Sequence, residues 1–191
     1  MLKQQPPVET FNDTDGVIFF PSDNPDENFL INGVLQFYMN HHTVNTRETD
    51  NKQVEQPWLF LPDKEITATP NEYEASSPKK IKEHIIEQAE QKMVDIPERK
   101  ITSETESLDM MAYFYHLNRD YLTLFNEKND VTLALITDEQ RMPRAYWTAN
   151  KMLSEQETGK NYTILPLETK SQSNKTGNLK ETALLWAWKI D

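Results

Sequence analysis

The run VTLALI at residues 131–136 is the stretch on which the expected fold depends. It is almost entirely apolar and rich in residues that favour strands, and polar residues bound it on both sides. A strand buried on both faces has this continuous pattern, whereas a half-exposed strand alternates. We therefore expect residues 131–136 to lie at the centre of a sheet.

A helix is predicted upstream of this strand, starting at residue 78. Ser77 is a good helix cap, and Pro78 follows it at the position where proline is best tolerated in a helix. Ile81, Ile85 and Ala89 then recur at four-residue spacing with polar residues between them. This pattern predicts an amphipathic helix of about four turns.

A second, longer helix is predicted from Ser103 to about Phe125. Ser103 and Glu106 match a capping box, in which each residue satisfies a free backbone N–H group at the helix start. Steps of 100° per residue give two adjacent apolar stripes, the second of which includes Phe114 and Leu117. A helix with so wide an apolar arc must lie at the centre of its domain or be covered by a partner. We favour cover from within the same chain.

The chain after residue 136 is expected to add a helix at 143–156 and strands at 162–167 and 183–190. Before residue 76, short apolar bursts between turn-rich runs predict strands at residues 17–20, 34–39 and 58–61. Eight of the 11 prolines lie at or before residue 78, which favours short or edge strands there.

These elements predict an α+β fold. A β-rich N-terminal segment would precede a helix-helix-strand-helix-strand-strand part packed on a small mixed or antiparallel sheet. The expected organisation is a flexible arm at 1–16, an acidic β-rich segment at 17–75 and an α+β domain at 76–191. One continuous domain over 17–191 is the alternative.

The amino-acid composition excludes several classes of protein and of chemical site. There is no cysteine, so disulfides, thiolate nucleophiles and cysteine-ligated metals are excluded. Only 4 glycines are present, and none forms a phosphate-binding loop or a dinucleotide motif. No apolar run approaches the roughly 20 residues of a membrane span, and no secretory signal is visible. We therefore expect a cytoplasmic protein without a cofactor.

Charge is concentrated in the N-terminal part of the chain. The net charge is −9 over residues 1–78 and −2 over residues 79–191, within a total of −11. Such a chain is repelled by phosphate backbones and by anionic lipid, so nucleic-acid and membrane binding are not expected. The expected partner is another protein with a basic surface, and a homo-oligomer is left open.

Two histidine arrangements have ordinary structural explanations. His41 and His42 would point to opposite faces of a strand, so we interpret them as a polar turn and not as metal ligands. His116 and Asp120 are four residues apart on the long predicted helix and can touch, as a general base and its orienting carboxylate do. Without an identifiable nucleophile, we interpret them as a surface pair.

The most enzyme-like arrangement is a set of charged residues after two predicted strands. Asp138 and Glu139 follow the strand at 131–136, and Glu168 and Lys170 follow the later strand. Carboxylates at strand ends with a nearby lysine can hold Mg²⁺ and activate water. They predict, as an alternative, a metal-dependent hydrolase or nuclease.

The favoured hypothesis is a non-enzymatic binding protein with a regulatory or assembly role. Its support is the scarcity of catalytic motifs, the acidic N-terminal part and the surplus of apolar side chains on two predicted elements. The excess of 15 lysines over 5 arginines suggests an AT-rich genome, such as that of a phage or mobile element. The predicted binding surface consists of Phe114, Leu117, Tyr121, Trp186 and Trp188.

Overall fold

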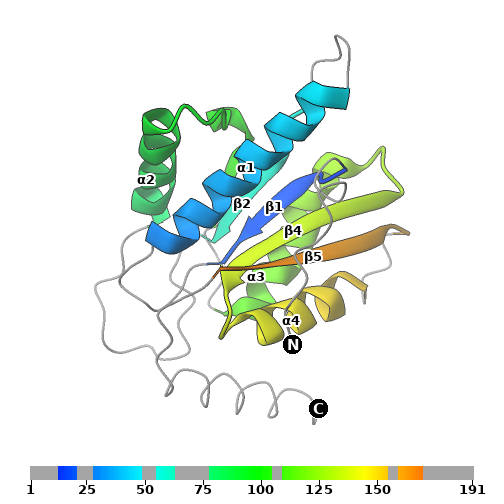
Figure 1. Ribbon diagram of the computed structural model, residues 1–191. Coiled ribbons are helices and arrows are strands. Elements are labelled where there is room, and N and C mark those ends of the chain that lie inside the picture. Colours follow the sequence, from blue (N-terminus) through cyan, green and yellow to red (C-terminus); the bar gives the residue numbers. More distant parts are fainter. Residues whose placement is uncertain are drawn as a thin grey trace, which may run out of the picture.

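A five-stranded parallel sheet forms the centre of the molecule (Figure 1). The computed structural model describes residues 13–20, 28–48, 55–62, 78–104, 109–154 and 159–169. The strands are β1 (Gly16–Phe19), β2 (Trp58–Pro62), β3 (Ile101–Glu104), β4 (Asp130–Asp138) and β5 (Asn161–Thr169). They lie in the order β3-β2-β1-β4-β5, and every neighbouring pair is parallel.

Helices connect successive strands and cover both faces of the sheet (Figure 1). They are α1 (Asn28–Glu48), α2 (Pro78–Gln91), α3 (Met110–His116) and α4 (Met142–Ser154), with short 3₁₀ turns at Glu98–Lys100 and Leu122–Phe125 and a π-helical turn at Leu117–Tyr121. Parallel strands require such crossovers, since a tight turn can join only antiparallel neighbours.

Side chains alternate along each strand, so the sheet supports two separate cores. Val17, Phe19 and Ile136 belong to a cluster that packs against α1 and α2. Ile18 and Leu135 belong to the other cluster, which packs against α4 and against residues 110–125, called the α3 segment below. The fold is thus a three-layer α/β/α arrangement.

The expected α+β fold with a mixed or antiparallel sheet is therefore wrong, and its error begins in α1. Residues 34–39, expected as a strand, lie within this helix. Leu30, Val34 and Tyr38 recur every four residues and are all buried, as one face of a helix requires. Because a helix joins β1 to β2, the two strands run in the same direction.

The long helix predicted from Ser103 is also wrong at its start. Ser103 lies in β3, paired with Leu61 of β2. The residue that caps α3 is Asp109, whose side chain accepts a hydrogen bond from the backbone N–H of Ala112 at 2.8 Å. A π-helical turn at Leu117–Tyr121 then changes the angle between successive side chains. The two apolar stripes therefore belong to one segment whose helical periodicity changes along its length.

Other predictions are confirmed. The predicted helices at 78 and at 143–156 correspond to α2 and α4, and the strand at 131–136 is β4, inside the sheet between β1 and β5. The predicted strand at 183–190 lies outside the described residues, and the domain boundaries stay predictions. Among the described residues, no helix is long and apolar enough to cross a bilayer.

Two leucines of the α3 segment test this packing. Leu117 is 0% exposed, whereas Leu124 is 48% exposed. We expect Leu117→Ala to lower the free energy of unfolding by about 2–5 kcal/mol, because it leaves a cavity in the core. Leu124→Ala should lower it by less than about 1 kcal/mol. Urea denaturation of both variants provides the comparison, and equal losses would contradict the packing described.

Candidate functional site

The strand order reverses between β1 and β4, which creates a topological switch point. From β1 the chain proceeds through β2 to β3 on one side, and β4 and β5 lie on the other. In open parallel sheets, ligands bind outside the carboxyl ends of the strands at such a point, where the loops diverge. The carboxyl ends of β1 and β4 are therefore the first place to examine.

Asp138 lies at the carboxyl end of β4 and is 3% exposed. Its Oδ1 accepts hydrogen bonds from the backbone N–H groups of Gln140 and Arg141, both at 2.9 Å. These bonds close the turn between β4 and α4, which begins at Met142. The carboxylate is therefore held in one orientation before any ligand arrives.

The structure brings the backbones of three predicted acidic residues to the same edge. The backbone N–H of Glu139 donates to the carbonyl of Thr169 at 3.2 Å. Asp138 pairs with Thr169, and Thr137 pairs with Glu168, in the β4–β5 ladder. The side chain of Glu168 and all of Lys170 lie outside what the structure describes.

Buried polar groups surround this position. Thr137 is 0% exposed, and its Oγ1 has no hydrogen-bond partner. Arg141 lies in the turn after Asp138 and Arg144 lies in the first turn of α4, and both are buried. An unsatisfied buried hydroxyl is uncommon in folded proteins, so Thr137 marks this edge as unusual.

The carboxyl edge fits only a metal ion that takes few of its ligands from the protein. Within the described ranges, no group of three or more His, Asp or Glu side chains is arranged to hold an ion. Asp138 and Glu139 are thus too few for a site in which the protein supplies all ligands. Mg²⁺ is commonly held by one or two carboxylates, with water and substrate phosphate as the other ligands, and this arrangement remains compatible.

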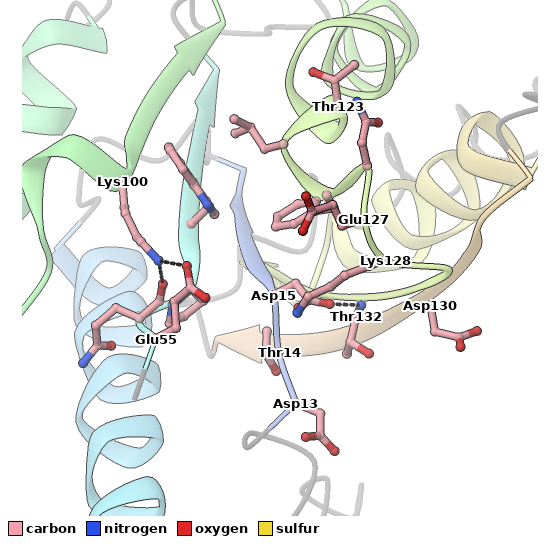
Figure 2. Close-up of a pocket in the computed structure, with 16 residues that line it drawn as sticks. Asp13, Thr14, Asp15, Glu55, Lys100, Thr123, Glu127, Lys128, Asp130 and Thr132 are labelled. Atoms are coloured by element: carbon pink, nitrogen blue, oxygen red, sulfur yellow. Dashed lines mark hydrogen bonds and ion pairs between the residues drawn. The ribbon is translucent and has the colours of Figure 1, made fainter. Parts of the chain in front are cut away.

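A cavity of about 980 Å³ lies at the opposite, amino edge of the sheet (Figure 2). Its walls come from the segments that precede β1, β2 and β4, together with the end of the α3 segment. Asp15 pairs with Lys128 and also accepts a hydrogen bond from the backbone N–H of Thr132. On another side of the cavity, Lys100 Nζ lies 2.9 Å from Glu55 Oε1.

The two histidine arrangements have structural surroundings. His41 is buried in α1, not in a turn, and its ring lies 6.0 Å from that of Phe37. His116 Nδ1 and Asp120 Oδ2 are 3.6 Å apart, and Arg119 contacts both side chains. The hydrogen bond from Arg119 holds the pKa of Asp120 below its ordinary value, as expected for a surface charge cluster.

The predicted binding surface is mostly internal where it is described. Phe114 and Leu117 are 0% exposed in the core below the sheet, so in this conformation neither side chain can reach a partner. Tyr121 is partly buried, and its hydroxyl donates to the carbonyl of Ser103 at 3.0 Å. Trp186 and Trp188 lie outside the described residues, so the binding role of the set stays a prediction.

Sequence reasoning missed both the switch point and the amino-edge cavity. The switch point requires the strand order, which depends on recognising α1 as a helix. The cavity is lined by residues far apart in the chain, such as Gln56 and Glu127, and no local pattern connects them. Comparisons with protein-family models, curated proteins and solved structures found no match to this chain.

Two substitutions at Asp138 separate its hydrogen bonding from its charge. Asp138→Ala removes the acceptor of two backbone N–H groups and should lower the free energy of unfolding by about 1–3 kcal/mol. Asp138→Asn retains Oδ1 as an acceptor and should stay within about 1 kcal/mol of the parent. Chemical denaturation measures both, and a fully stable Ala variant would show that the turn does not depend on these bonds.

The ion pair at the cavity predicts a pH effect. The hydrogen bond and positive charge of Lys100 hold the pKa of Glu55 below its ordinary value of 4.5. The stabilisation from this pair is therefore complete above the ordinary pKa and is lost as the pH falls through the lowered one. NMR titration should show the pKa of Glu55 returning toward its ordinary value in Lys100→Met, and an unchanged pKa would contradict the pairing.

Proposed function

We propose that the chain is a magnesium-dependent hydrolase of small phosphate esters, with its site at the carboxyl ends of β1 and β4. The observation that carries the proposal is the position of Asp138, a buried and fixed carboxylate beside the topological switch point. Ligand sites concentrate at this point in doubly wound sheets. A carboxylate fixed there before binding is what ordered catalysis requires.

One oxygen of Asp138 is assigned to a ligand in this proposal. Both N–H groups of the turn bond to Oδ1, so Oδ2 is the oxygen that would bind the ion. Asp138 would therefore bind Mg²⁺ through Oδ2, with half-buried Glu139 beside it. The bound ion would polarise a phosphoryl oxygen of the substrate and make a coordinated water more acidic.

Glu139 is the candidate general base. In the proposed reaction a water oxygen attacks phosphorus and the bond to the leaving oxygen breaks. One proton of the water passes to the Glu139 carboxylate, and the leaving oxygen takes up a proton from solvent. Arg141 and Arg144 add positive charge that favours an anionic substrate at this edge.

Charge selects small substrates over nucleic acid. The chain carries a net charge of −11, which repels long polyanions, and only a local positive region can offset this. A small phosphate ester contacts only the edge itself, where the two arginines lie. The protein-binding role expected from the sequence stays a separate prediction.

The experiment measures hydrolysis of p-nitrophenyl phosphate and bis-p-nitrophenyl phosphate with and without Mg²⁺ or Mn²⁺. We expect metal-dependent turnover that falls at least about tenfold in Asp138→Asn, because losing a unit charge near the ion removes roughly 1–4 kcal/mol of attraction. The Asn variant retains the turn, so its loss of activity would report on the charge.

Glu90→Gln is the matched control, since Glu90 is an exposed carboxylate on α2. It should retain both turnover and metal affinity measured by calorimetry. Absence of metal binding by the parent chain, or an Asp138→Asn variant as active as the parent, would reject the proposal.

A further inference from the structure

The walls of the amino-edge cavity differ in how firmly they are held. The lining is acidic, with five carboxylates against two lysines. At the start of β2, Lys100 Nζ donates to the carbonyl of Gln56 at 2.6 Å. Beside it, the backbone N–H of Trp58 donates to the carbonyl of Asp15 at 3.0 Å. Hydrogen bonds between segments far apart in the chain therefore fix this wall.

Another wall is the end of the α3 segment, where the backbone leaves α-helical geometry. The backbone N–H of Leu122 donates to the carbonyl of Leu117, five residues earlier. The N–H of Asn126 donates to the carbonyl of Thr123, only three residues earlier, at 3.1 Å. Bonds of 3₁₀ type have poorer geometry than α-helical ones, and stretches of this kind within helices often mark hinges. Residues 117–125 therefore lack the regular hydrogen-bond ladder that holds α3.

A buried amide lies in the π-helical turn. Asn118 is 3% exposed, and its Oδ1 accepts a hydrogen bond from the Tyr162 hydroxyl at 3.3 Å. Its Nδ2 has no hydrogen-bond partner among the described residues. A buried donor without a partner destabilises the closed segment, because it has lost its hydration and gained nothing in exchange. When the turn unwinds, water reaches the amide and this cost disappears.

The contacts that keep residues 117–125 closed are side-chain contacts. Leu117, Leu122 and Phe125 are buried in the core on the α4 face of the sheet. The Tyr121 hydroxyl donates to the carbonyl of Ser103 in β3 at 3.0 Å. None of these contacts pairs one strand with another, and the core on the α1 face includes none of these residues. The segment can therefore open while the sheet and its other face stay folded.

We propose that residues 117–125 open as a local unit, that Asn118 raises the frequency of this opening, and that the opening widens the amino-edge cavity. Thr123, Leu124 and Phe125 line the cavity, so it loses a wall when they move away (Figure 2). Local opening of this kind requires less free energy than global unfolding. The inference does not depend on hydrolase activity at the carboxyl edge.

Native-state hydrogen exchange of the full chain, followed by NMR at increasing urea, measures the opening at single amides. We expect the Leu122 amide to exchange at least about a hundredfold faster than the Leu135 amide in the centre of β4. Its rate should also depend less on urea, because a local opening exposes less surface than global unfolding. Equal rates and equal urea dependence at the two amides would overturn the proposal.

Ile85→Val is the matched control for local opening. Ile85 is 0% exposed and belongs to the core on the α1 face, away from the α3 segment. The lost methylene destabilises the whole fold, so the Leu135 amide should exchange about threefold to tenfold faster. The Leu122 amide should keep its rate, because its opening does not expose residue 85. An equal increase at both amides would show that Leu122 exchanges through global unfolding, against the proposal.

The double substitution Asn118→Leu with Tyr162→Phe tests the role of the buried amide. It replaces the polar pair with apolar side chains of similar size, so the Leu122 amide should exchange about tenfold more slowly. Unchanged or faster exchange would reject the role of Asn118. If the double variant does not fold, Tyr162→Phe alone removes the hydrogen bond to Oδ1 and should speed exchange of Leu122 about threefold. Unchanged exchange in that variant would likewise reject it.

Discussion

Burial of β1 and β4 on both faces is the constraint on which the rest of the structure depends. Val17 and Ile18 point to opposite faces of the sheet, and both are 0% exposed, as are Leu133 and Ala134. A strand buried on both sides needs helices on both sides, so each connection between strands must contain one. Most polar side chains of the described residues then lie on the outer helix surfaces and at the two edges where strands begin and end, although His41, Asn118 and Thr148 are buried within helical segments.

The two edges differ in backbone polarity because the helices run antiparallel to the strands they connect. Helices start near the carboxyl ends of the strands, where their partial positive charge favours anions, and end near the amino ends, where exposed carbonyls favour cations. The turn after Asp138 leads into the start of α4, whereas the end of the α3 segment at Thr123 and Asn126 lines the acidic cavity. A phosphate ester at the first edge agrees with this polarity.

Local sequence patterns predicted the elements better than they predicted the sheet. The VTLALI run and the Ile81-Ile85-Ala89 spacing identified β4 and α2 because each pattern lies within one element. Residues 34–39 were mistaken for a strand because a six-residue apolar run does not distinguish the two structures. The buried positions over the longer span from Leu30 to Tyr38 do. Because of that one error, the helical crossover from β1 to β2 was not predicted. The parallel strand order and the switch point, which depend on it, were not predicted either.

The candidate site was partly predictable for the same reason. Asp138 and Glu139 follow a recognisable strand, whereas the partners of Gln56 and Asp15 come from distant segments. Asp130 and Asp138 lie at the two ends of β4, about 26 Å apart at roughly 3.3 Å per residue. Over this distance unpaired charges are largely screened at physiological salt. Ligand binding at one edge can therefore affect the other edge only through the sheet. Because helices cover both faces of β4, this strand transmits little structural change unless its pairing with β1 or β5 changes. A ligand at the carboxyl edge is thus expected to leave the amino edge unchanged.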